Sequence, residues 1–172
     1  EEECTILEPS AGSGAILDAL RDKFPLAELH AFEVHATLGD ILAAKGYELD
    51  GCDFLDAEPA ATFDRVIMNP PFEGMQDADH VRHAFKMLKP GGRLVAIMSP
   101  GPFFRTDRKA SDFREWFEDN GGEKRELPPN SFKESGTGVN TVIVTLDKVE
   151  SPDWLNHNDE PAAVMSGAVQ GE

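Results

Sequence analysis

The sequence predicts an α/β fold in which a mainly parallel sheet is covered by helices on both faces. Strand-like and helix-like hydrophobic patterns alternate along almost the whole chain. The apolar run GRLVAIMS at 92–99 is the most convincing strand, and strong glycine and proline signals end several of the helices. Alternation of this kind is typical of a parallel sheet between two helical layers, in which ligands bind at the carboxyl ends of the strands.

The first half of the chain supplies three expected strands and two helices. CTILEP at 4–9 is an apolar strand that enters a glycine turn, and SGAILDALRDKF at 13–24 follows with apolar side chains on one helical face. A second strand at 29–34 leads into a helix over 36–45, which stops at a glycine. We expect a short third strand near 47–54.

The second half continues the alternation. FDRVIMN at 63–69 is a strand, and residues 77–88 form an amphipathic helix that ends at the sequence Lys-Pro-Gly-Gly. After the strand at 92–99, the remaining elements are one helix and two strands, at 107–120, 124–127 and 141–148. These patterns give a sheet of seven strands.

Composition describes one soluble domain. The 172 residues are 40% hydrophobic and 28% charged, and no apolar run approaches the about 18 residues of a membrane span. We expect the domain to cover 1–150 and a Pro-, Asn- and acid-rich peripheral tail to cover 151–172. The first three residues are glutamates and not a basic, then apolar, leader. We therefore expect a cytoplasmic protein, with Cys4 and Cys52 as buried reduced thiols.

The net charge of −16 opposes a nucleic-acid partner, but the charge is uneven. Residues 100–133 are locally neutral and contain the basic cluster Arg105, Arg108 and Lys109. The acidic excess lies in the rest of the chain. For any one of these basic residues, a phosphate contact and an ordinary solvated surface are equally open interpretations.

Three features lie at the ends of three successive expected strands. The turn EPSAGSG at 8–14 places Gly12 and Gly14 where a ligand can approach the backbone closely, although the third glycine of the dinucleotide fingerprint is missing. Glu33 ends the second strand, where a carboxylate can accept hydrogen bonds from ribose hydroxyls. Asp53 ends the third strand and can accept from an adenine amino group. Each alone is more often an ordinary turn or a solvated acid; together they indicate a nucleoside-like ligand.

The fourth strand ends in Asn69-Pro70-Pro71-Phe72. Proline has no N–H to donate and restricts the residue before it to extended geometry. The two prolines therefore end the strand and hold Asn69 and Phe72 stiffly at its exposed end. The competing interpretation is a merely structural double-proline turn.

With these residues assembled, the chain resembles the class I S-adenosylmethionine-dependent methyltransferases, from about Cys4 to Lys148. Within that class it is most similar to the adenine-specific DNA amino-methyltransferases. The resemblance implies a Rossmann-like fold with an antiparallel last strand, S-adenosylmethionine as the cofactor, and methylation of the exocyclic amino group of adenine in DNA. The catalytic residues that it implies are Asn69, Pro70, Pro71 and Phe72. The cofactor-binding residues that it implies are Glu8, Pro9, Ser10, Ala11, Gly12, Gly14, Glu33, Val34, Asp53, Phe54 and Asn69.

The chemistry of such an enzyme explains why it needs the tetrapeptide Asn69-Pro70-Pro71-Phe72. An exocyclic amino nitrogen is a poor nucleophile because its lone pair is delocalised into the ring. If the Asn69 side-chain oxygen and the Pro70 carbonyl accept its two hydrogens, the nitrogen is drawn toward a tetrahedral shape and its lone pair is freed. Phe72 offers a face for an extruded base. Methylation of a cytosine ring carbon is excluded, because no cysteine nucleophile lies in this turn.

We expect nucleic acid to be engaged along 102–109 and 131–138, the second of which a plain connecting loop explains equally well. The expected contacts are made by Phe103, Arg105, Arg108, Lys109, Phe132 and Lys133. The pair His80 and His83 is expected at the surface, and no metal site is predicted.

Several alternatives stay open. An RNA adenine methyltransferase would use the same tetrapeptide, whereas protein-glutamine methyltransferases usually end it in tyrosine. A non-catalytic module that keeps the fold is opposed by the intact tetrapeptide. The first strand begins by residue 4, so we expect no segment ahead of it that closes over the cofactor, and no stretch is large enough for a target-recognition domain. Specificity then comes from short loops, from a partner subunit, or from a separate domain of a longer protein.

Overall fold

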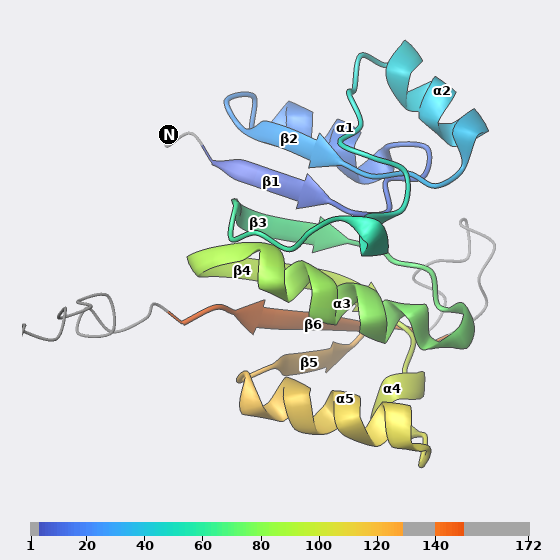
Figure 1. Cartoon of the computed structure of the whole chain (residues 1–172), viewed down its shortest axis with the longest axis vertical. Coiled ribbons are helices and arrows are strands. Elements are labelled where there is room, and N and C mark those ends of the chain that lie inside the picture. Colours follow the sequence, from blue (N-terminus) through green and yellow to red (C-terminus); the bar gives the residue numbers. More distant parts are fainter. Residues whose placement is uncertain (1–3, 129–139, 150–172) are drawn as a thin grey trace, which may run out of the picture.

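The structure is a computed structural model that describes residues 4–128 and 140–149. Its described strands form one sheet in the order β2-β1-β3-β4-β6-β5 (Figure 1). The strands are β1 Thr5–Glu8, β2 Glu28–Ala31, β3 Phe63–Met68, β4 Leu88–Met98, β5 Glu123–Glu126 and β6 Val142–Asp147. Strands β1 to β4 pair in parallel, and β6 lies antiparallel between β4 and β5. The predicted mainly parallel sheet with an antiparallel last strand is therefore confirmed.

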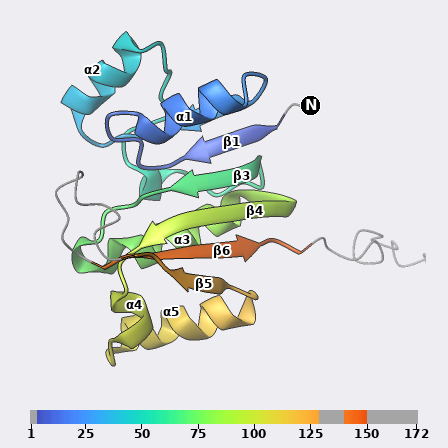
Figure 2. The same ribbon diagram turned by 180° about the vertical axis from the view of Figure 1, so that it is seen from behind.

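Helices lie on both faces of this sheet, as predicted. Helix α3 lies in front of the sheet in Figure 1 and α1 lies behind it, and their order is reversed in Figure 2. The helices are α1 Ala15–Lys23, α2 Ala36–Ala44, α3 Gln76–Met87, α4 Gly101–Phe104 and α5 Arg108–Asp119, with short 3-10 helices η1 Phe54–Asp56 and η2 Glu73–Met75. Edge-on packing of Phe85 against Trp116 joins α3 to α5.

The main core lies between the sheet and helices α3 and α5. Alternate residues of a strand point to opposite faces, and in β4 Leu94, Ala96 and Met98 are buried while the residues between them are half-buried. Helix α3 packs Val81 and Ala84 into the same cluster. The apolar side chains that recur every 2 residues in the strands and every 3.6 residues in the helices thus pack together in one core.

The expected third strand does not form. Within 47–54 the only described ladder contact is a single bridge between Phe32 and Gly51. The backbone N–H of Ala31 donates to the side chain of Asp50, at 2.9 Å to Oδ2, and not to a neighbouring backbone carbonyl. The described sheet consequently has six strands and not the predicted seven. Cys52, expected to be buried in that strand, is exposed.

Two further expectations concern parts outside this core. In the parts of the chain that the structure describes, no helix has both the length and the apolar character needed to cross a bilayer. The expected tail at 151–172 lies outside the described residues.

Candidate active site

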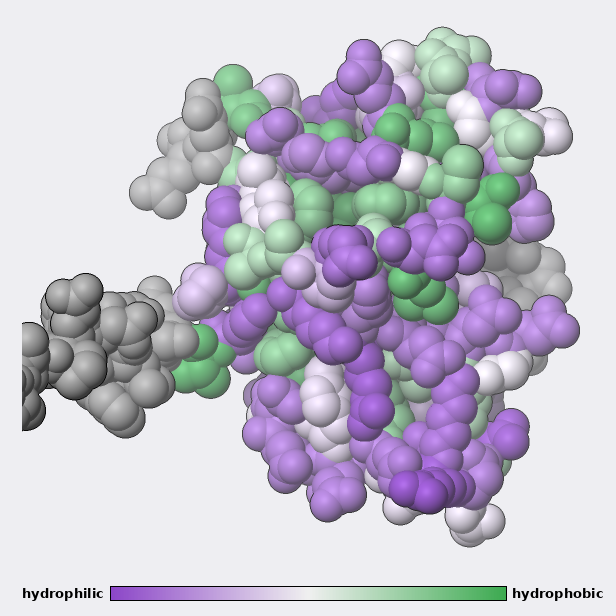
Figure 3. Space-filling model, in the orientation of Figure 1, coloured by the Kyte–Doolittle hydropathy of each residue, from purple (hydrophilic) through white to green (hydrophobic). Residues whose placement is uncertain are grey.

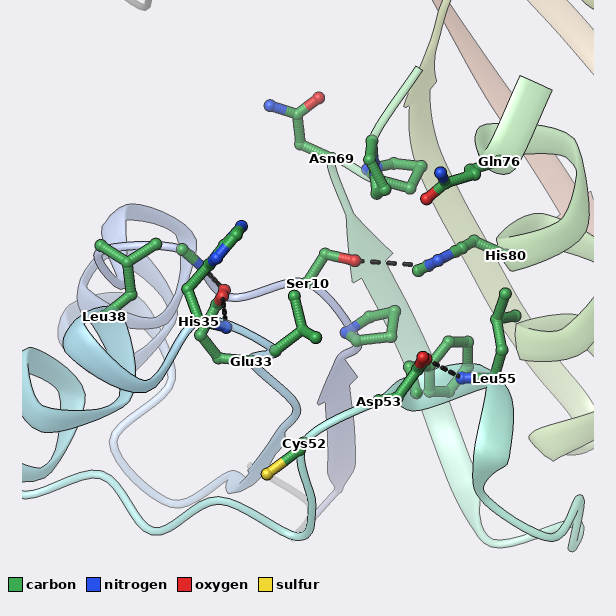
Figure 4. A pocket seen from close by; sticks show the side chains of 16 residues that line it. Ser10, Glu33, His35, Leu38, Cys52, Asp53, Leu55, Asn69, Gln76 and His80 are labelled. Atoms are coloured by element: carbon green, nitrogen blue, oxygen red, sulfur yellow. Dashed lines mark hydrogen bonds between the residues drawn. The ribbon is translucent and has the colours of Figure 1, made fainter. Parts of the chain in front are cut away.

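A cavity of about 370 Å³ opens where the described parallel strands end. That volume lies within the range of about 300–1,000 Å³ that small-molecule sites occupy. Figure 4 shows Glu33, His35 and Leu38 on one side of it and Gln76 and His80 on the other, with Ser10 between them. Its wall is formed by Pro9, Ser10, Gly12, Glu33, Val34, His35, Leu38, Cys52, Asp53, Phe54, Leu55, Asn69, Pro70, Pro71, Gln76 and His80.

Glu33 fixes the glycine turn. Its Oε2 accepts a hydrogen bond from the Gly12 N–H at 2.7 Å, and its Oε1 accepts one from the His35 N–H at 2.7 Å. The residue is only 7% exposed, so a carboxylate is held at the cavity wall by two backbone donors. Gly12 has φ +56°, and a Cβ added there would meet nothing within 4 Å. A ligand can therefore come close to the backbone at Gly12.

A second set of hydrogen bonds, made by Lys45, Asp18 and Tyr47, stabilises the same turn. Lys45 Nζ donates to the Ser13 carbonyl at 2.7 Å and to Asp18 Oδ2 at 2.6 Å, and the Tyr47 hydroxyl donates to Asp18 Oδ1 at 2.9 Å. At Gly14 a Cβ would lie 2.7 Å from a methyl carbon of Leu42. Gly14 also has φ +87°, so a side chain there would be strained and would displace Leu42. The contacts of Lys45, Asp18 and Tyr47 were not predicted, because these residues are distant in sequence.

Glu8 lies behind the cavity and not on its wall. It is 2% exposed, and its Oε2 has no hydrogen-bond partner among the described residues. Burial raises the pKa of its carboxyl to about 8, while a hydrogen bond from the Leu17 backbone acts in the opposite sense. The predicted residues Ala11 and Gly14 are likewise not part of the cavity wall.

Asp53 and Phe54 occupy the wall in different ways. Asp53 is exposed, and its Oδ1 accepts from the Leu55 N–H at 2.9 Å at the start of η1. The Phe54 ring is buried and lies 5.4 Å from the ring of Phe32 and 4.8 Å from that of His83. An acidic acceptor and an apolar floor are therefore presented side by side.

His80 is also part of this wall, which corrects the expectation that it lies at the surface. It is 7% exposed, because α3 packs on η1 and its ring lies 5.6 Å from that of Phe54. Its Nδ1 lies 3.3 Å from the Ser10 hydroxyl oxygen. Burial lowers the pKa of His80, with nearby Asp53 acting in the opposite sense. The imidazole therefore joins the glycine turn to α3 through Ser10.

The tetrapeptide enters the cavity through its first three residues. Asn69 and Pro71 are exposed and Pro70 is buried, and all three belong to the wall. Phe72 is half-buried, does not line the cavity, and precedes η2. The structure thus brings the predicted acceptors to the same cavity as Gly12 and Glu33, but not the predicted aromatic face.

The predicted substrate residues lie elsewhere. Phe103 packs edge-on against Phe113 and Phe117 of α5, with Lys124 Nζ 4.9 Å from its ring centre. Hydrophilic residues cover much of the face drawn in Figure 3, and each of the three basic side chains has a carboxylate partner. The pairs are Arg105–Asp107 at 2.7 Å, Arg108–Asp112 at 3.5 Å and Lys109–Asp79 at 2.7 Å. Phe132 and Lys133 lie outside the described residues.

The described residues contain no group of three or more His, Cys, Asp or Glu side chains placed to hold a metal ion. The cavity wall carries hydrogen-bonding side chains, the imidazoles of His35 and His80, and apolar side chains.

No family model matches the sequence. A release factor glutamine methyltransferase from Koribacter versatilis is 30% identical over 92 residues, which cover 49% of this chain and 33% of that relative. The chain thus spans about a third of the length of the curated relative that it matches.

Solved structures give a more extensive likeness. A predicted O-methyltransferase from Agrobacterium tumefaciens has a TM-score of 0.63 at 21% identity, covering 84% of this chain and 74% of that one. The 16S rRNA N2 G1207 methyltransferase from Thermus thermophilus, in complex with AdoMet and guanosine, has a TM-score of 0.59 at 17% identity, covering 88% and 37%. The chain has the Rossmann-like fold of the class I S-adenosylmethionine-dependent methyltransferases.

Proposed function

We propose that this chain transfers a methyl group from S-adenosylmethionine to a planar nitrogen, either an exocyclic amino group or a side-chain amide. One observation carries the proposal. Asn69 and Pro70, which can accept the hydrogens of such a nitrogen, line the same cavity as Gly12, Glu33 and Asp53. Hydrogen-bond acceptors for a substrate and features suited to a nucleoside therefore share one wall.

The cavity has the chemistry that the cofactor requires. Glu33 supplies a carboxylate for the ribose hydroxyls, Asp53 an acceptor for the adenine amino group, and Phe54 an apolar surface. Gly12 leaves room for the methionine portion beside the turn. Bound there, S-adenosylmethionine supplies an electrophilic methyl group.

The chain's own residues orient the nitrogen that receives the methyl group. A planar amino or amide nitrogen becomes a better nucleophile when both its hydrogens are accepted by fixed oxygens, because this favours a tetrahedral shape. Asn69 provides a side-chain oxygen and Pro70 a backbone carbonyl, and Pro71 restricts the backbone between them and the next helix. This is positioning and electrostatic stabilisation, and no strong base is required before attack.

For the substrate, we propose adenine in DNA, as the tetrapeptide ending in Phe72 implies. The RNA counterpart is the nearest alternative, since it poses the same chemical problem. The structural likeness to the 16S rRNA N2 G1207 methyltransferase from Thermus thermophilus supports a nucleobase nitrogen in general. A target-recognition domain or a partner subunit would then supply the contacts to the flanking strand.

Two observations favour a second candidate, glutamine in a protein. The relative that is 30% identical is a release factor glutamine methyltransferase. The net charge is −16, and Arg105, Arg108 and Lys109 are each paired with an aspartate, which leaves them less available for phosphates. An amide nitrogen presents two hydrogens to Asn69 and Pro70 as an adenine amine does.

The test is incubation with methyl-labelled S-adenosylmethionine and DNA, RNA or protein in parallel, followed by identification of the modified atom. The Asn69→Ala variant serves as the blank. Label on an adenine amino nitrogen supports the first candidate, and label on a glutamine amide supports the second. Label on oxygen or carbon in all three substrates would overturn the proposal.

A further inference from the structure

Asp77 is completely buried, although it follows closely on the tetrapeptide, in which Asn69 and Pro71 are exposed. It is the second residue of α3, and its exposed fraction is 0%. A carboxylate in such a place needs hydrogen-bond donors, because burying it without them is costly. The donors that it has connect two separate segments at the carboxyl end of the sheet.

Three donors surround this carboxylate. Oδ2 accepts from the Ser99 backbone N–H at 2.9 Å and from the Ser99 hydroxyl at 2.7 Å, and Oδ1 accepts from the Ala78 N–H at 3.0 Å. Ser99 directly follows β4, the strand next to β3 in the sheet. Asp77 therefore joins the segment that follows the tetrapeptide to the end of the neighbouring strand.

The link between the tetrapeptide and Asp77 has an unusual backbone. Gly74 and Met75 are consecutive left-handed residues, with φ values of 59° and 60°, and Met75 is the only described residue other than glycine with a positive φ. This conformation is unfavourable for methionine and persists only where surrounding contacts impose it. The contacts here are the burial of the Met75 side chain and a 3.0 Å hydrogen bond from Lys109 Nζ to the Gly74 carbonyl, and the Asp77 carboxylate follows two residues later.

We propose that Asp77 and Ser99 are positioning residues that hold the Asn69–Phe72 loop in the geometry needed to accept the substrate nitrogen. Both lie outside the cavity wall, so they act through the loop and contact neither substrate nor cofactor. Proline rigidity fixes the start of the loop at β3. The hydrogen bonds between Asp77 and Ser99, which we call the clamp, fix its other end at β4. The inference rests on the proposed function, because it assigns the clamp to that reaction.

The molecule provides its own matched control. At the opposite end of the sheet, Asp64 accepts from the Thr5 N–H at 2.9 Å and lies 2.8 Å from the Thr5 hydroxyl. The same change, Asp64→Asn, therefore perturbs the same kind of contact far from the cavity.

The experiment compares Asp77→Asn, Asp64→Asn and the wild-type chain, with the substrate identified as above. We expect Asp77→Asn to lower kcat by about ten-fold or more, since small misplacements of reacting groups have effects of this size, and to leave affinity for S-adenosylmethionine within about three-fold. Backbone amides of 72–76 should lose protection against hydrogen exchange in this variant only. Asp64→Asn should lower the unfolding temperature with kcat unchanged.

Substitutions of Ser99 provide a milder test if Asp77→Asn folds poorly. Ser99→Ala should lower kcat in the same direction, Ser99→Thr should retain it because the hydroxyl is kept, and the two changes at Asp77 and Ser99 should not be additive. Unchanged kcat and unchanged exchange in folded Asp77→Asn would overturn the inference. Hydrogen exchange also separates the two proposals. If Asp77→Asn loses protection at 72–76 but the wild-type chain methylates none of the substrates, the clamp on the loop is supported and the proposed function is overturned.

Discussion

The two ends of the sheet are each held by an aspartate that binds one residue through its backbone N–H and its hydroxyl. At the amino ends of the strands, Asp64 binds Thr5 and an ion pair 3.0 Å long joins it to Lys89. At the carboxyl ends, Asp77 binds Ser99, and within the described residues its carboxylate forms no ion pair with a basic side chain. Asp64 is 31% exposed and Asp77 is fully buried.

The similar contacts produce opposite electrostatics. The hydrogen bond from the Thr5 backbone, and then Lys89, lower the pKa of Asp64 to about 2, whereas burial raises the pKa of Asp77 above its usual range. Ionised Asp64 therefore stabilises the fold, but ionised Asp77 is held at a cost. The amino end is built for stability, and we infer that the carboxyl end gives up some stability to fix the position of a loop.

The functional role of the carboxyl end is tested most directly at the tetrapeptide Asn69–Phe72. Asn69→Ala should reduce methyl transfer by about 100-fold or more, the size expected when a preorganised hydrogen-bonding group is removed from a transition state. Affinity for S-adenosylmethionine should stay within a few-fold, because the Asn69 oxygen acts on the substrate nitrogen. Single-turnover rates and calorimetry measure the two effects separately. Normal turnover in this variant would mean that the tetrapeptide does not carry the reaction.

Glu33 tests whether stability and binding are coupled at the carboxyl end. Loss of a charge-assisted acceptor typically costs about 1.5–3 kcal/mol, so Glu33→Ala should weaken S-adenosylmethionine binding about ten-fold or more. Because Glu33 also accepts from the Gly12 and His35 backbones, the same change should lower the unfolding temperature. Glu33→Gln keeps one acceptor oxygen, so its affinity for S-adenosylmethionine and its unfolding temperature should lie between those of the wild-type chain and of Glu33→Ala. Unaltered affinity in Glu33→Ala would place the cofactor elsewhere.

Much of this arrangement could be predicted from the sequence, because its determinants are local. The strands at β1, β3 and β4 and the helices α3 and α5 were identified from apolar periodicity and from stop signals, and Asn69 and Glu33 were found because parallel strands end on one side of a sheet. The parts that failed depend on contacts between distant segments. The side chain of Asp50 takes a hydrogen bond that a third strand would have made.

The site contains similar cases. His80 was expected at the surface, but α3 packs on η1 and buries its ring against Phe54. Phe103, expected at a substrate surface, is half-buried and packs edge-on against Phe113 and Phe117 of α5, and its contact with a substrate stays a prediction. The contact between Asp77 and Ser99 joins residues 22 apart in sequence, and no local pattern indicates it.

The pH dependence of stability sharpens the contrast between the ends. The pKa of folded Glu8, about 8, lies above its ordinary 4.5, so the folded chain binds this proton more tightly than the unfolded chain does. Its contribution is fully present below about 4.5 and is lost as the pH rises through about 8. Asp64 behaves oppositely, since its contribution is present above 3.8 and is lost as the pH falls through about 2.

Denaturant unfolding across this pH range measures both effects. Glu8→Gln should remove most of the decline in the free energy of unfolding between about 4.5 and about 8. Asp64→Asn should leave that decline and reduce the loss in acid. A wild-type decline that persists unchanged in Glu8→Gln would show that the carboxyl is already ionised in the folded chain.

The smallest expected effect concerns His80 and the charge of the cofactor. Its imidazole lines the cavity next to Ser10, and burial lowers its pKa below the usual 6.5, against the influence of Asp53 and Asp79. S-adenosylmethionine carries a sulfonium charge that S-adenosylhomocysteine lacks, so a protonated His80 should repel the first ligand more than the second. We expect the affinity for S-adenosylmethionine, divided by the affinity for S-adenosylhomocysteine and measured by calorimetry, to fall a few-fold as the pH falls below 6.5. In His80→Asn, which has no titrating group, the ratio should stay constant across the same range. Equal slopes in both proteins would mean that the sulfonium binds away from α3, and that His80 serves only to hold Phe54 and the glycine turn in place.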